Sequence, residues 1–137
     1  MDNDRVKHSI SVARRMVEIG KSYNLSNKEL EELFVLGLNH DIGYEFCDGS
    51  DHNVVGGNIL KRSNYKYWRE VYYHGVVQEE YSSLYLKILN TADMQVDKYG
   101  NVVGFEERLK DIKSRYGEDS VVYKRCVLLI EFITSEV

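Results

Sequence analysis

The sequence predicts an all-α protein: a compact helical bundle of about seven helices, formed by a single domain that spans residues 1–137. Proline is absent, and because proline is the strongest local interruption of a helix, long uninterrupted helices are expected. Apolar residues recur at the helical spacing of three and four positions, and no segment shows sustained strand alternation. We therefore expect essentially no β-sheet.

The first half of the chain is expected to begin with a helix over residues 4–22, followed by a second helix. Ser26 and Glu29 form the capping-box pattern that starts this second helix. The helix delivers the pair His40-Asp41 at its C-terminal end. Residues 42–51, which include Gly43, Asp48, Gly49 and Ser50, are typical of a loop.

The rest of the chain is expected to continue in helices. His52 opens a short helix through Leu60, in which Gly56 and Gly57 permit close approach of another backbone. Further helices are expected over residues 67–74, 82–99, 105–116 and 120–135, with a break at residues 100–104.

Composition and charge limit the classes of function. With 137 residues, of which 43% are hydrophobic and 29% charged, the chain is suited to folding around a core. A formal net charge of −4 disfavours a nucleic-acid polymer as partner, because polyanions are bound by clustered Lys and Arg, whereas a small anionic substrate is compatible. No signal peptide and no run long enough to span a membrane are evident. We expect a cytoplasmic protein without membrane contact, and a homo-oligomer stays open.

The two cysteines give no sign of a disulfide framework or a zinc ribbon. Cys47 and Cys126 are far apart in the sequence and neither belongs to a CxxC pair. Reduced, partly buried thiols are the expected state of both.

Histidines and aspartates provide the chemical signal of the chain. All four histidines fall within the first 74 residues, and each lies on a predicted helix or at a helix end. Asp93 is in line with apolar residues, where an unpaired carboxylate is costly and needs a partner. Imidazoles and carboxylates without thiolates suit Fe, Mn, Co, Ni or Zn better than calcium. The candidate metal ligands are His8, His40, Asp41, His52, His74 and Asp93.

At these six residues the sequence resembles the HD superfamily of metal-dependent phosphohydrolases. The stretches LGLNHDIGYEF, DHNVVGGNIL and LNTADMQ are similar to the motif blocks of that family, in the same order, within residues 5–97. Residues 107–112, together with Arg115-Tyr116-Gly117, look like the tail of small bacterial members. The six-residue set is similar to the branch that binds two metal ions, whereas a simpler branch uses only the first His, the His-Asp pair and the final Asp.

The resemblance implies a centre of two divalent transition-metal ions with Asp41 as the bridging ligand, because a carboxylate has two oxygens. His8, His40 and Asp93 are then assigned to the first ion, and His52 and His74 to the second. A bound ion activates water for attack on a phosphate. The leaving group needs a proton, which Asp51 beside His52, or Asp97 one turn beyond Asp93, can supply; the alternative for both is a solvated acid or support for the ligands.

Substrate contacts are less clearly indicated. Many relatives with the sequence HDIG continue with a lysine that can contact phosphate, whereas this chain has Tyr44. A cationic cluster after the His52 helix can replace it as a phosphate clamp, or can be a solvated polar face. The cluster consists of Lys61, Arg62, Lys66 and Arg69.

Three classes of function follow from the sequence. The first is a hydrolase of a small phosphate ester, such as a nucleotide or a dinucleoside polyphosphate. The second is a di-iron oxygenase of the HD type, because similar ligands can activate oxygen. The third is a regulatory module that binds metal or nucleotide without turnover. Ligand identity alone does not separate the first two classes.

Overall fold

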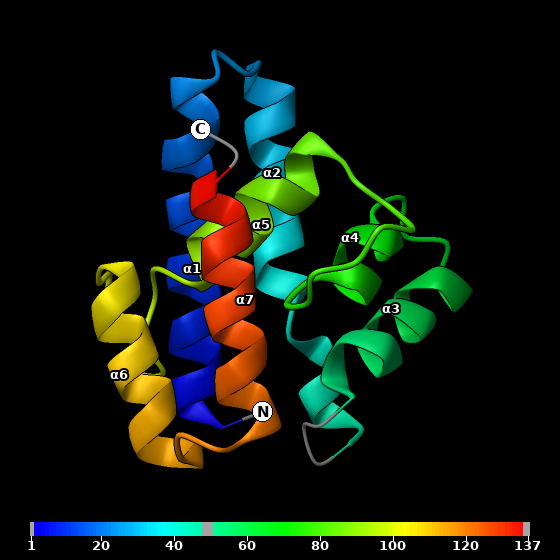
Figure 1. Ribbon diagram of the computed structural model, residues 1–137. Coiled ribbons are helices and arrows are strands. Elements are labelled where there is room, and N and C mark those ends of the chain that lie inside the picture. Colours follow the sequence, from blue (N-terminus) through cyan, green and yellow to red (C-terminus); the bar gives the residue numbers. More distant parts are fainter. Residues whose placement is uncertain (1, 48–50, 136–137) are drawn as a thin grey trace.

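The computed structural model describes residues 2–47 and 51–135, which form seven α-helices and one short 3-10 helix and contain no strand (Figure 1). The elements are α1 (Asn3–Ser22), α2 (Asn27–Asn39), η1 (Ile42–Glu45), α3 (His52–Arg62), α4 (Trp68–Tyr73), α5 (Leu84–Asp93), α6 (Phe105–Tyr116) and α7 (Val121–Ser135). The all-α prediction is confirmed. The sequence assigns residues 42–51 to a loop; that prediction is wrong at Ile42–Glu45, which form η1, and residues 48–50 lie outside the described residues.

The starts of α1, α2 and α5 are fixed by side chains that satisfy the free amides of the first turn. Ser26 and Glu29 form the predicted capping box: the Glu29 amide donates to Ser26 Oγ at 3.2 Å, and the Ser26 amide donates to Glu29 Oε1 at 3.0 Å. Asp2 caps α1 and Ser83 caps α5 in the simpler one-bond manner.

Two apolar clusters hold the helices together. Helices α1 and α2 pack side by side, and α5 packs against both (Figure 1). Buried residues of these helices, with Leu60 of α3 and Val71 of α4, form the larger cluster. Helices α6 and α7 pair with each other and form a smaller cluster around Ile112 and Leu129. Within the described ranges no helix combines the length and the hydrophobicity that crossing a membrane requires.

Helix α3 packs closely against α4 and η1, as its two glycines predicted. A Cβ atom on Gly57 would lie 2.5 Å from Cβ of Tyr72, and one on Gly56 would lie 3.0 Å from the backbone nitrogen of Gly43. Any larger residue would force these backbones apart. The close packing brings the start of α3 to the end of α2.

The predicted helix over residues 82–99 is wrong in its last six residues, 94–99, because α5 ends at Asp93. Asp97 Oδ1 accepts hydrogen bonds from the amides of Tyr99 and Asn101, both at 2.9 Å, and closes a turn. Val96 pairs with Val102 in an isolated antiparallel bridge. A side chain that binds backbone amides two and four residues ahead competes with the helix. Val96, which the sequence places on an apolar helix face, is buried in this turn instead.

Candidate metal centre

The six residues singled out by the sequence converge on one site. His8 lies within α1, and the other five stand at helix ends: His40 caps the end of α2, Asp41 precedes η1, His52 begins α3, His74 caps the end of α4, and Asp93 ends α5. All are buried except His52, which is partly exposed. Because the ends of five helical elements meet α1 here, side chains far apart in the sequence lie within contact distance.

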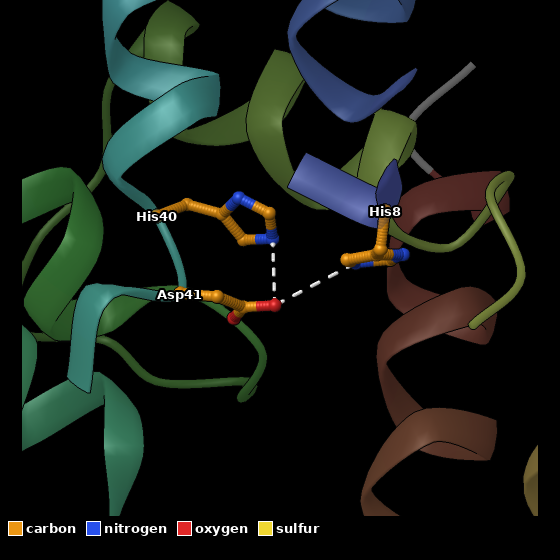
Figure 2. A group of neighbouring side chains, drawn as sticks. All are labelled: His8, His40 and Asp41. Carbon is orange, nitrogen blue, oxygen red and sulfur yellow. Dashed lines mark ion pairs between the residues drawn. The ribbon is translucent and has the colours of Figure 1, made fainter. Parts of the chain in front are cut away.

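Asp41 lies between two pairs of histidines. Its Oδ2 atom is 3.3 Å from His40 Nε2 and 3.7 Å from His8 Nε2, the two contacts drawn in Figure 2. Its Oδ1 atom is 3.3 Å from His52 Nε2 and 3.6 Å from His74 Nε2. Each oxygen of one carboxylate therefore faces a different histidine pair.

Asp93 completes the half of the site that contains His8 and His40. Its Oδ1 atom lies 2.8 Å from His8 Nε2 and 3.4 Å from His40 Nε2. These two imidazoles therefore face carboxylate oxygens of both Asp41 and Asp93. The other half, with His52 and His74, faces Asp41.

Three of the imidazoles are held in one tautomer by the main chain. A carbonyl oxygen can only accept a hydrogen bond, so an imidazole nitrogen that bonds to it carries the proton. The three bonds run from Nδ1 of His8 to the Asp97 carbonyl (2.9 Å), from Nδ1 of His40 to the Gly37 carbonyl (2.7 Å), and from Nδ1 of His74 to the Val71 carbonyl (2.6 Å). In the neutral ring each Nε2 then directs a lone pair into the site, as in metal-binding histidines.

The donor atoms fit a transition-metal centre. Ligands about 2.1 Å from one ion are about 3 Å from each other, close to the separations found here. His40 Nε2 is buried and within 3.4 Å of two carboxylate oxygens, yet it has hydrogen-bond geometry to neither. His52 Nε2 lies 3.3 Å from His74 Nε2. Three overlapping groups of these residues can hold an ion: His8, His40 and Asp41; His40, His74 and Asp93; and Asp41, His52 and His74.

The charges in the site depend strongly on one another. Burial alone would lower the pKa of His40, but the carboxylates of Asp41 and Asp93 raise it well above its usual value. Burial alone would raise the pKa of both aspartates, but the neighbouring histidines lower these pKa values well below the usual range. The carboxylates are therefore ionised, and the cluster requires positive charge, which protons or metal ions can supply.

His52 is positioned by η1. A Cβ atom on Gly43 would collide with the backbone carbonyl of His52, so only glycine allows the two segments to approach this closely. The ring of Tyr44 stacks on the ring of His52, with centroids 4.3 Å apart. The guanidinium carbon of Arg5 lies 3.2 Å from the centroid of the Tyr44 ring. Tyr44, at the position where lysine was expected from the family resemblance, thus supports a candidate ligand and contacts a cation.

The site opens into a cleft of about 580 Å³ that is rich in charged side chains. Five of the six clustered residues line it, all except His40. Its wall also carries the acids Asp2 and Asp4 and the cations Arg5, Lys98, Arg108, Arg115 and Arg125. A chain that is acidic overall therefore concentrates five cations around one cleft, which suits a small anionic ligand.

The four cations predicted as a phosphate clamp do not line this cleft. Lys61 and Arg69 lie over the ring of Trp68, and Lys66 lies over the ring of Tyr67. Lys61 and Arg62 end the helix that His52 begins, so they lie about 14 Å along its axis from the site. All four side chains belong to exposed residues.

The two acids predicted to donate a proton also lie outside the lining of the cleft. Asp51 is exposed and precedes α3 without capping it. The carboxylate of Asp97 accepts from the amides of Tyr99 and Asn101. Burial works against ionisation of Asp97, but the bonds from Asn101 and Tyr99 lower its pKa. Its main-chain carbonyl, rather than its carboxylate, holds His8.

Sequence reasoning missed the cations that line the cleft. Arg108 and Arg115 are seven residues apart, so they share one face of α6, and Arg5 shares a face of α1 with His8. These spacings are a usable signal. They do not by themselves show that the shared face borders the site, because charged residues on a helix are usually solvated.

One comparison with known proteins finds a match. The family model described as HD domain matches residues 5–127. No curated protein and no solved structure matches the chain. The matched range extends from the start of α1 into α7 and includes all six clustered residues.

Proposed function

The chain belongs to the HD domain family, and from that membership we propose that it is a metal-dependent phosphohydrolase that acts on a small phosphate ester, either a nucleotide or a dinucleoside polyphosphate. The observation that carries the proposal is the placement of Asp41, whose two oxygens face two different histidine pairs. A carboxylate in this position suits a bridge between two ions, an arrangement that serves phosphate hydrolysis.

We assign two divalent transition-metal ions, of Fe, Mn, Co, Ni or Zn, to the two halves of the site. His8, His40 and Asp93 would hold one ion, His52 and His74 the other, and Asp41 both. When bound, such ions lower the pKa of a water ligand and neutralise charge that develops on phosphoryl oxygens.

The residues of the site would support this chemistry by charge and by orientation. Two carboxylates with four neutral imidazoles leave positive charge once two divalent ions are bound, and that charge attracts a phosphate dianion. The main-chain bonds to the Nδ1 atoms hold three imidazole rings in place before substrate arrives. Cations of the cleft wall would orient the rest of the anion.

Asp51 and Asp97 are the proposed donors of the leaving-group proton. The lowered pKa of Asp97 and the hydrogen bonds to its carboxylate disfavour it as an acid at neutral pH. Asp51 directly precedes His52 and is exposed, and its side chain makes no capping bond to α3.

The cleft helps to rank the alternatives. Five cations around the site serve no purpose in a di-iron oxygenase that acts on a neutral organic substrate. They suit a phosphohydrolase or a nucleotide-binding regulatory module, because both bind an anion. The cations that line the cleft therefore favour an anionic substrate. Whether that substrate is hydrolysed distinguishes a phosphohydrolase from a regulatory module.

The test uses one preparation of the full chain, loaded in turn with Mn, Fe, Co or Ni ions. Hydrolysis of an aryl phosphate and of nucleotides, and oxygen consumption, are measured on the same sample, with Asp41→Ala as a control for contaminating phosphatases. We expect hydrolysis that a chelator abolishes and that Asp41→Ala lacks. Oxygen uptake with no phosphate turnover would favour the oxygenase, and binding with neither activity would favour the regulatory module.

A further inference from the structure

Helix α6 forms a cationic wall of the cleft that is built around Asp111. Arg108 Nη1 and Arg115 Nη2 both donate to Asp111 Oδ2, each at 3.2 Å. Arg108 Nε also donates to the main-chain carbonyl of Asp93, at 3.3 Å. Arg108 is buried, so these bonds lock it between the end of α5 and Asp111. Arg108 therefore anchors the wall at the edge of the candidate metal centre.

Arg115 lies two helical turns beyond Arg108 on the same face of α6 and also lines the cleft. Its bond to Asp111 holds the Arg115 guanidinium close to that of Arg108, because Arg115 Nη2 and Arg108 Nη1 bond to the same carboxylate oxygen. Its Nε atom is buried and has no hydrogen-bond partner among the described residues. A buried donor without an acceptor is costly, so a shift of the guanidinium that brings Nε to an anion in the cleft would be favourable.

The wall carries more positive charge than its own acid can neutralise. One carboxylate, that of Asp111, serves two guanidinium groups. Arg125 of α7 lines the same cleft and is exposed. All three arginines line one cleft together with Asp93 of the candidate metal centre. Guanidinium groups bind phosphate oxygens well because their N–H donors form a planar fork.

We propose that Arg115 and Arg125 form a second anion subsite, which binds the distal phosphate of a diphosphate or polyphosphate ester while the reacting phosphate lies at the metal centre. This inference rests on the proposed function and makes its substrate class narrower. Arg115 and Arg125 are specificity-determining residues, and Arg108 and Asp111 position Arg115. A substrate with a single phosphate leaves the subsite empty.

Binding tests the subsite without turnover. Calorimetry on the metal-loaded full chain, desalted to remove free ions, compares methylenediphosphonate, a diphosphate that resists hydrolysis, with inorganic phosphate. We expect the diphosphonate to bind at least about tenfold more tightly than phosphate, and Arg115→Met to remove most of that advantage while weakening phosphate binding far less. Lys110→Met is the matched control, because Lys110 lies on the same helix and its side chain is 73% exposed outside the cleft.

Arg125→Met gives an independent variant, since removal of an exposed side chain does not threaten folding. It should also reduce the preference for diphosphonate, and Arg115→Lys should restore part of it by keeping the charge. The subsite would be overturned if the variants lost affinity for phosphate and diphosphonate equally. It would also be overturned if both Met variants kept the full preference for diphosphonate over phosphate.

Kinetics separate the subsite from the proposed function. With a nucleoside diphosphate, Arg115→Met should raise KM about tenfold with little change in kcat, and with an aryl phosphate the rise in KM should be much smaller. If no phosphate ester is hydrolysed but the diphosphonate preference depends on Arg115, the subsite stands and the hydrolase proposal fails. If hydrolysis is robust but Arg115→Met affects both substrates equally, the hydrolase stands and the subsite fails.

Discussion

The ring of Tyr44 lies nearly parallel to the ring of His52, with an angle of 18° between the planes and 4.3 Å between the centroids. The side chain of His52 is 23% exposed, more than any other of the six clustered residues. The stack therefore covers one face of the most exposed imidazole in the cluster. Tyr44→Ala should weaken binding of the ion assigned to His52 and His74 and leave binding of the other ion unchanged.

Titration of the metal-free protein with metal ions, monitored by calorimetry, measures this effect. In Tyr44→Ala the site of His52 and His74 should bind its ion about tenfold less tightly, which is the typical cost of losing a residue that orients a metal ligand. Tyr44→Phe keeps the ring and should keep both affinities. Equal loss of both ions in Tyr44→Ala would show that Tyr44 supports the whole fold of the site rather than His52.

Asp97 holds His8 through its main-chain carbonyl, so a change in its side chain separates positioning from acid catalysis. Asp97→Asn retains the oxygen that accepts from Tyr99 and Asn101 and removes the acid. We expect kcat within about threefold of wild type and an unchanged pH profile, whereas loss of a general acid costs about 10²–10⁴-fold. A loss of that size, greater for poor leaving groups, would make Asp97 the proton donor. Asp97→Ala, which opens the turn, should lower Tm.

The pKa of His40 predicts how the metal-free protein responds to pH. The Asp41 and Asp93 carboxylates outweigh burial and raise this pKa well above 6.5. A raised pKa means that His40 contributes its full stability below pH 6.5 and loses that contribution as the pH rises through the raised value. The lowered pKa values of Asp41 and Asp93 act in the opposite direction: their contribution is present above pH 3.8 and is lost as the pH falls.

The metal-free protein should therefore lose thermal stability as the pH rises above neutrality. Bound ions replace the proton on His40, so the metal-loaded protein should not show this loss, and its stability should increase as ligands deprotonate. Tm measured between about pH 5 and pH 9, with chelator and with Mn ions, tests the prediction. The same slope in both samples would show that His40 does not control it.

The two cysteines should differ in reactivity. Cys126 is buried, and burial raises the pKa of its thiol to about 11. Cys47 is only partly buried. Because the thiolate is the reactive form, a thiol reagent at pH 8 should modify about one cysteine per chain rapidly, and the second only after unfolding. Cys47→Ser should remove the fast phase, and a persistent fast phase in that variant would show that Cys126 is accessible.

The sequence predicts the ligand cluster and the helical class for physical reasons. Absence of proline and a persistent helical spacing leave few alternatives to helices. The capping box at Ser26 and Glu29 sets the start of α2, and the length of α2 then determines where His40 and Asp41 lie. The identities of the six residues come from the ordered motif. Their convergence needs the packing of five helices, which spacing alone does not specify.

The residues around the centre are harder to predict. The cationic cluster after the His52 helix suggested Lys61 and Arg62 as substrate contacts, but both end α3, at the opposite end of that helix from His52. Arg115 belongs to a helix whose apolar face meets α7, so its position in the cleft depends on tertiary contacts. The end of α5 was missed because Val96 fits an apolar helix face as well as it fits a bridged turn.

Metal content per chain, measured by elemental analysis of wild type, Asp41→Ala and His52→Ala prepared identically, tests the two-ion centre most directly. Wild type should contain about two ions per chain, and Asp41→Ala should lose most of both because it deletes the shared ligand. His52→Ala should retain about one ion, held by His8, His40 and Asp93, with activity sharply reduced. If His52→Ala keeps the full wild-type metal content and activity, His52 is not a ligand and the two-ion centre is contradicted.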